Sequence, residues 1–215
     1  MKVIQLDIEG FRSLRKVSWK PGDLNVLIGP NGTGKSNLLR FLELMSVSAQ
    51  GRLGKYIQSL GGMDAIVWDG QVSNISFSLM SSPIEIPALI EGNIEPQLDA
   101  MDYTLKIVRL GQSSAYRIQS ETAKYHPFKC RRLEDPFQYF QRDERSVQIF
   151  MQQGPISPLE AISEEETLLS TMSTPFVIGR LLPFFRHQLA SWTIYHDLRV
   201  DKDAPIRQAA ITRLE

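Results

Sequence analysis

The sequence predicts an α/β fold in which a glycine-rich loop joins a short apolar strand to an amphipathic helix, with antiparallel strands after it. Three observations support this fold class. Residues 2–9 alternate between apolar and polar side chains, as a half-buried strand does. Residues 24–28 form a short apolar run typical of a buried strand, and apolar side chains recur at helical spacing from Lys35 onward. Period-two alternation returns after Gly61.

The elements follow one another between recognisable turn signals. The expected strands are residues 2–9, 14–19, 24–28, 75–79, 103–109 and 114–119. The first helix is expected from Lys35 to about Gln50. A second is expected at Ser163, because a serine followed by Glu164–Glu166 suits a helix start. A third is expected from Thr174 or the residues after it towards Tyr195, with Pro183 kinking or dividing it.

Composition and charge exclude several classes of protein. The chain has 215 residues, with 24 basic side chains against 24 acidic ones, so its formal charge is zero. A single cysteine, Cys130, cannot form an internal disulfide, and charges interrupt the apolar residues of the N-terminus as no signal peptide would allow. No apolar run is long enough to span a membrane. These features predict a cytoplasmic protein without a membrane partner.

Charge is unevenly distributed along the chain. Residues 1–60 hold nine basic and four acidic side chains, a net charge of +5. Either residues 1–60 bind an anion, or the charge on the protein surface is merely uneven. Residues Lys129–Arg132, beside Tyr125 and Phe128, could touch nucleic acid, although a surface loop explains them as well.

One motif carries chemistry. Residues 29–36 match the pattern G-x-x-x-x-G-K-[ST] in full. Glycines let backbone N–H groups turn inward around phosphates, and the helix that follows adds further N–H groups. Lys35 would reach the outer phosphates as the catalytic cation, and Ser36 would be the Mg²⁺ ligand. The predicted nucleotide-binding residues are Gly29, Pro30, Asn31, Gly32, Thr33, Gly34, Lys35, Ser36 and Asn37. The alternative is a glycine-rich turn without a ligand.

Residues 27–39 resemble the Walker A segment of ABC-type ATPase heads. Asn37 after the serine, and an opening at residues 8–14 similar to that of RecF-like heads, favour the RecF and SMC branch over transporter subunits. The resemblance implies a P-loop NTPase of the ABC-ATPase-head type, with a mixed sheet, a P-loop helix, an antiparallel β subdomain and C-terminal helices. It also implies that Arg12 is a further nucleotide contact; an exposed hairpin arginine is the alternative.

The same resemblance implies a function. It implies ATP and Mg²⁺ as cofactors, a head-to-head homodimer, and ATP hydrolysis in the full-length protein coupled to DNA repair, recombination or anti-phage defence. One alternative is a nucleotide-binding regulatory module that does not hydrolyse ATP. An ABC transporter subunit is a further alternative, disfavoured by Asn37 and by the β-rich insertion after the first helix.

A hydrolysing head of this kind also needs a signature motif, a Walker B strand ending in Asp-Glu, and a switch histidine. Asp69 follows an apolar run but precedes Gly70 and is better interpreted as a turn, and residues 59–62 carry the signature letters in the wrong order. His187 and His196 are more typical of core or surface histidines, and Gln71 is a weak candidate sensor of nucleotide. Whether this chain is itself an enzyme is therefore left open.

The expected organisation has three parts: a P-loop lobe at residues 1–60, an antiparallel β-rich part at 61–160 and a helical segment at 161–215. Since the hydrolytic motifs are not recognisable, we expect this chain to be the N-terminal portion of a longer ATPase.

Overall fold

The computed structural model describes residues 1–70, 72–85, 98–111, 113–127, 137–144, 146–151, 154–156, 162–172 and 181–196. Nine strands form one sheet in the order β2-β1-β3-β5-β6-β7-β8-β9, and β4 pairs with β5. The strands are β1 (Val3–Phe11), β2 (Leu14–Trp19), β3 (Asn74–Ser81), β4 (Ile84–Glu85), β5 (Leu98–Arg109), β6 (Tyr116–Pro127), β7 (Phe137–Arg142), β8 (Val147–Met151) and β9 (Gly154–Ile156).

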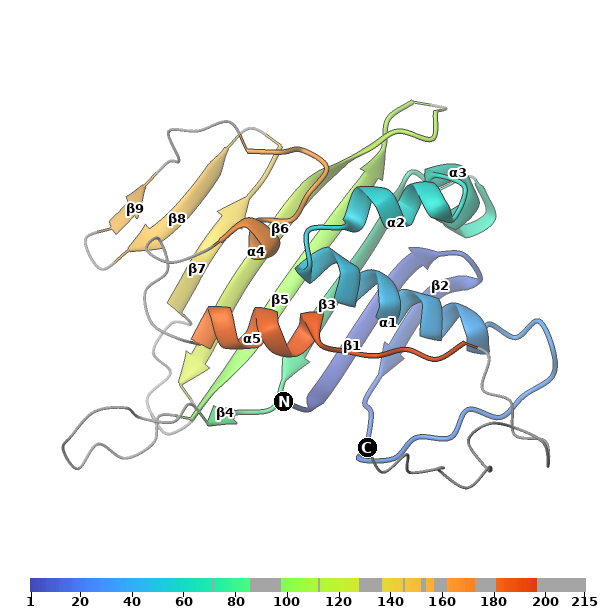
Figure 1. The fold of residues 1–215 in the computed structure, drawn as a ribbon, viewed down its shortest axis with the longest axis horizontal. Coiled ribbons are helices and arrows are strands. Elements are labelled where there is room, and N and C mark those ends of the chain that lie inside the picture. Colours follow the sequence, from blue (N-terminus) through green and yellow to red (C-terminus); the bar gives the residue numbers. More distant parts are fainter. Residues whose placement is uncertain are drawn as a thin grey trace, which may run out of the picture.

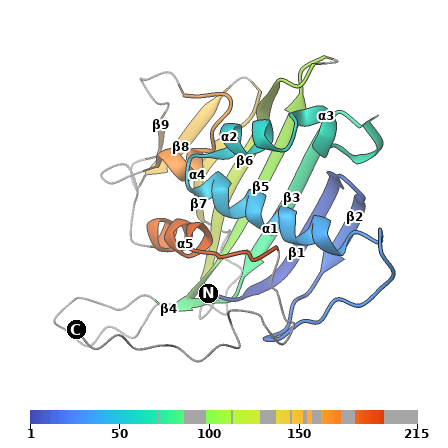
Figure 2. The ribbon, with the colours of Figure 1, turned by 45° about the vertical axis from the view of Figure 1, so that its right-hand side comes forward.

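Helices cover one face of this sheet, as Figures 1 and 2 both show. The helices are α1 (Lys35–Ala49), α2 (Leu53–Ser59), α3 (Met63–Ile66), α4 (Leu168–Thr171) and α5 (Leu181–Ala190). A 3-10 turn, Trp68–Gly70, follows α3. Helix α1 lies across the sheet and packs against α5. None of the helices in the described ranges is long and apolar enough to cross a membrane.

A chain of aromatic rings fills the space between α1, α5 and the sheet. Phe41 of α1 meets Phe11 of β1 edge-on at 5.2 Å and Phe77 of β3 at 5.5 Å. Phe77 in turn contacts Tyr103 of β5, which contacts Phe185 of α5. All five rings are buried. Because aromatic rings bury large areas and favour edge-to-face contacts, this chain connects three strands with two helices that lie far apart in the sequence.

Most of the expected elements are confirmed. The first two expected strands are β1 and β2, the first helix is α1, and the alternating segments from Ile75 and Tyr103 lie in β3 and β5. Their alternate side chains are buried, as period two requires. The residues after Gly111 return as β6, antiparallel to β5. The division into three parts stays a prediction, although β1 and β2 share one sheet with the later strands.

The expected strand at residues 24–28 is wrong. These residues have no regular secondary structure, and Leu24, Val26 and Ile28 are 85%, 73% and 91% exposed. An apolar run becomes a buried strand only when other strands or helices cover it, and none of the described strands pairs with this one. The sheet that we expected to be mixed has only antiparallel pairings among the described residues.

Two expectations for the C-terminal helices are also corrected. No helix begins at Ser163: its Oγ accepts the N–H groups of Glu165 and Glu166 in a turn, and α4 begins later, capped by Thr167. Helix α5 ends at Ala190, before Tyr195. Pro183 is the third residue of α5, where the first turn needs no intrahelical N–H donor. The region around Thr174 lies outside the described residues.

Candidate phosphate-binding site

The glycine-rich loop leads directly into the N-terminus of α1. Gly32 and Gly34 have φ angles of 86° and 98°, in the left-handed region that favours glycine. A Cβ at Gly34 would lie 2.7 Å from the Ser13 hydroxyl oxygen, so a side chain there would have to displace this hydroxyl group. No side chain caps the N-terminus of α1. The first N–H groups of the helix are therefore available to an anion, which the helix dipole also favours.

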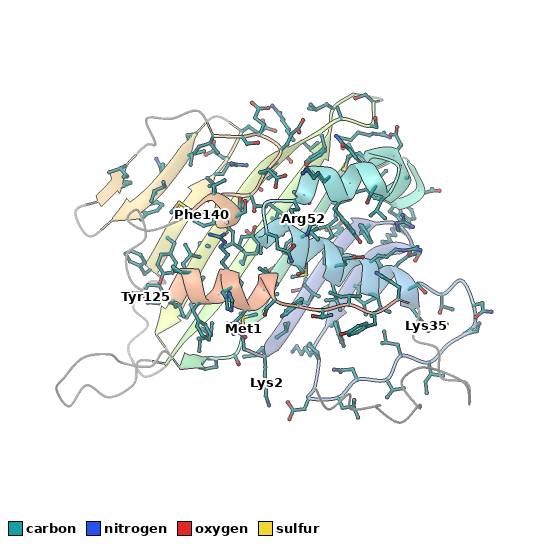
Figure 3. The ribbon with its side chains drawn as sticks, in the orientation of Figure 1. Met1, Lys2, Lys35, Arg52, Tyr125 and Phe140 are labelled. Carbon is teal, nitrogen blue, oxygen red and sulfur yellow. The ribbon has the colours of Figure 1, made fainter. Side chains whose placement is uncertain are left out.

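The ammonium group of Lys35 lies inside the same loop. It donates to the carbonyl oxygens of Gly29 at 2.6 Å and Pro30 at 2.7 Å, and the Thr33 hydroxyl donates to Pro30 at 2.9 Å. Figure 3 places Lys35 at the beginning of α1. Ser36 follows it and is exposed. An incoming phosphate would compete with the loop carbonyls for this ammonium group, and a charged acceptor makes the stronger hydrogen bond.

The turn between β1 and β2 lies against the beginning of α1. The Asn37 side-chain amide donates to the Ser13 hydroxyl at 2.8 Å. Arg12 adopts a φ of 47°, and its backbone N–H donates to the Ile66 carbonyl oxygen at 2.7 Å. Burial, with a smaller effect from nearby Arg40, lowers the pKa of Arg12. The structure thus brings Arg12 beside the helix that follows the loop, and its contact with nucleotide stays a prediction.

The described residues that were considered for hydrolysis do not form the expected motifs. Asp69 is in the 3-10 turn after α3, with a φ of 56°, so no strand leads into it. Gly61 and Gly62 form the turn after α2, as their positive φ angles require. His187 is on the exposed side of α5. Gln71, Cys130 and Lys129–Arg132 lie outside the described residues.

Sequence reasoning missed a polar group on α1. The Tyr56 hydroxyl donates to the Glu43 carboxylate at 2.8 Å and to the Arg40 carbonyl oxygen at 3.0 Å. His196, expected to be an ordinary core or surface residue, has its Nε2 2.7 Å from the same Glu43 carboxylate. The sequence gives one signal for this polar group. Ser36, Arg40 and Glu43 are spaced by four and three residues, which predicts that they share one side of α1.

The residues present fit a nucleotide with Mg²⁺. The uncapped helix N-terminus and the positive φ angles of Gly32 and Gly34 are what a phosphate cradle would need. Within the described ranges, no group of three or more His, Cys, Asp or Glu side chains could hold a metal ion by itself. Ser36 is the residue that would hold Mg²⁺, together with phosphate oxygens and water, which is a usual arrangement for this ion.

Of three comparisons with known proteins, one shows a family. A solved structure from work on ATP-driven dimerization and DNA-stimulated activation of SMC ATPases aligns with a TM-score of 0.39 and 13% identity, over 59% of this chain and 70% of that one. No curated protein matches the chain. The family model of the AAA ATPase domain matches residues 1–147, which include the loop, α1 and strands β1 to β7. Since this match covers more than half of the sequence, the chain belongs to the AAA ATPase domain family.

Proposed function

We propose that this chain binds ATP with Mg²⁺ at Gly29–Asn37. One observation carries the proposal: Lys35 and the uncapped N-terminus of α1 lie at one loop, in which Gly32 and Gly34 have left-handed φ angles. Backbone N–H groups and an ammonium group around one small space are what a triphosphate requires. Family membership supports the same activity.

Each residue has a distinct role in this proposal. The N–H groups of the loop and of the first turn of α1 hold the phosphates, and Lys35 moves from the loop carbonyls to the outer phosphate oxygens. The Ser36 hydroxyl holds Mg²⁺, which neutralises phosphate charge when it is bound. Arg12 adds a positive charge beside α1.

For the complete protein we propose ATP hydrolysis by a head-to-head dimer, coupled to DNA repair, recombination or anti-phage defence, in the cytoplasm. The resemblance of residues 8–14 and 27–39 to RecF-like and SMC heads supports this proposal. A regulatory module that binds ATP without hydrolysing it is the second candidate. It is favoured by the position of Asp69 in a turn rather than at the end of a strand.

The Lys35→Ala variant tests the binding site. Removing a charge-assisted hydrogen bond of about 1.5–3 kcal/mol should weaken binding of a non-hydrolysable ATP analogue with Mg²⁺ by about tenfold to a hundredfold. Isothermal titration calorimetry provides the measurement. Lys55→Ala, which removes an exposed lysine from α2, is the matched control. Equal analogue affinity in Lys35→Ala and the parent would contradict the proposed site.

ATP turnover distinguishes the two candidate functions. A DNA-coupled ATPase should hydrolyse ATP faster when duplex DNA is added, and the stimulation should fall steeply as salt is raised, since phosphate contacts release counterions. A regulatory module should bind the analogue with no measurable turnover, with or without DNA.

A further inference from the structure

Two arginines are brought together by contacts that do not involve their own side chains. The hydrogen bond between Asn37 and Ser13 attaches the β1–β2 turn to the first turn of α1. Arg12 directly precedes Ser13, and its backbone N–H is held by Ile66. Arg40 lies three residues after Asn37, on the neighbouring turn of the same helix. The two guanidinium groups are close enough to affect each other electrostatically, and Tyr56 is affected by both.

Neither guanidinium group has a hydrogen bond or an ion pair with another described residue. The Nε atom of Arg12 is buried and has no partner. Both arginines are only partly exposed. Two like charges in a partly buried place repel each other, and a buried donor without an acceptor is unfavourable. An anion between the two groups would remove both costs.

The nearest acid on α1 is already engaged. Glu43 lies three residues after Arg40, but its Oε2 atom is bonded to the Tyr56 hydroxyl and to His196. Burial, followed by the contacts with Glu43, raises the pKa of Tyr56, so its hydroxyl stays protonated and keeps donating to this carboxylate. The structure therefore directs Glu43 to partners other than the two arginines.

We propose that Arg12 and Arg40 form a second oxyanion site, one helical turn along α1 from Ser36, and that the site binds a phosphate group. Four residues of α-helix separate Ser36 from Arg40, about 6 Å along the axis. Planar guanidinium groups match the oxygens of a phosphate better than a lysine does. The phosphate belongs either to the nucleotide bound at the loop, in which case the inference rests on the proposed function, or to a separate phosphate.

Two variants test the site, each chosen to keep the fold. Arg40→Gln retains a good helix-forming residue, and Arg12→Asn places at this turn a residue that tolerates a left-handed φ. Arg52→Gln is the matched control, because Arg52 is an exposed arginine beyond the far end of α1 (Figure 3). Each protein is titrated with a non-hydrolysable ATP analogue plus Mg²⁺, and separately with inorganic phosphate.

The two sources of phosphate give different results. If the nucleotide supplies it, Arg40→Gln and Arg12→Asn should each weaken analogue binding about tenfold, the effect of one lost charge-assisted contact. If the phosphate is separate, Arg40→Gln should leave the affinity for the analogue unchanged. Inorganic phosphate should then bind the Lys35→Ala protein, and adding Arg40→Gln should weaken that binding about tenfold.

The proposal is overturned if Arg40→Gln and Arg12→Asn both behave like Arg52→Gln in both titrations, with thermal unfolding showing that the variants are folded. Failure of the proposed nucleotide site gives a different result. In that case the parent and Lys35→Ala proteins respond equally to the analogue, whereas the phosphate titration in the Lys35→Ala background still reports on the two arginines.

Discussion

Glu121 is a fully buried carboxylate whose hydrogen-bond partners come from two separate parts of the chain. It accepts the Tyr103 hydroxyl at 2.9 Å and the N–H groups of Leu168 and Leu169 at 2.7 and 3.0 Å. Removal from water raises the pKa of Glu121, and these donors together with Arg142 only partly oppose that change. No local pattern marks Glu121 in the sequence, because its donors lie 18 to 48 residues away.

The raised pKa makes a prediction about pH. The folded protein holds the Glu121 proton more tightly than the unfolded chain does, so protonation of this group stabilises the fold below the ordinary value of 4.5. That contribution is lost as the pH rises through the folded-state pKa. Glutamine does not titrate, so the Glu121→Gln protein does not lose this contribution to its stability when the pH rises. The free energy of unfolding of Glu121→Gln should therefore improve, relative to that of the parent, as the pH rises from about 4.5 into the neutral range.

Urea unfolding followed by tryptophan fluorescence measures this difference at several pH values. Glu144→Gln is the control, because Glu144 is exposed on the surface. A difference between Glu121→Gln and the parent that does not change with pH, or changes in the opposite direction, would show that the folded protein does not hold this proton more tightly.

Among the elements, the segment 162–172 connects the sheet to two helices. The Glu166 carboxylate accepts the N–H groups of Leu53 and Gly54, both at 3.2 Å, at the N-terminus of α2. The Thr167 hydroxyl donates to the Ser48 carbonyl oxygen in α1 at 2.8 Å, and the Glu164 carbonyl oxygen accepts the N–H of Ile118 in β6. We expected Glu164–Glu166 to begin a helix of their own. Instead, Glu166 caps the N-terminus of α2.

Replacing Glu166 by Ala should destabilise α2. A lost cap costs about 0.5–2 kcal/mol, and a carboxylate near a helix N-terminus also interacts favourably with the helix dipole. Hydrogen exchange should become faster at the amides of Leu53 and Gly54, and the free energy of unfolding should fall by about 1 kcal/mol. Glu165→Ala is the neighbouring control, since its carboxylate has no hydrogen bond within the described ranges. Equal effects of the two substitutions would contradict the capping role.

For the whole molecule, stability should depend on the aromatic chain rather than on the apolar run before the loop. Phe41 is fully buried between two aromatic neighbours, so Phe41→Ala should lower the free energy of unfolding by about 3–5 kcal/mol. Ile28 is 91% exposed, so Ile28→Ala should change it by less than about 0.5 kcal/mol. Chemical denaturation of both variants provides the comparison. A large loss in Ile28→Ala would show that residues 24–28 are covered in solution.

Local patterns were sufficient for much of the fold and for the candidate site. The alternation in Leu6 and Ile8, the glycines of the loop and the helical spacing after Lys35 each depend on neighbouring residues only. Steric limits and hydrophobic periodicity act over such short ranges, so β1, α1 and the loop between Gly29 and Ser36 could be predicted directly.

Tertiary contacts decided the rest. Whether residues 24–28 are buried depends on whether other strands pair with them. The apolar run itself contains no information about such neighbouring strands. The partners of Glu121, Glu166 and His196 lie far along the chain, so their roles follow from which surfaces meet. By itself the sequence determined which segment is the candidate phosphate site, because the pattern that marks it lies in consecutive residues. Only the folded chain determined that Arg12 and Arg40 lie together, because their closeness depends on how the β1–β2 turn packs against α1.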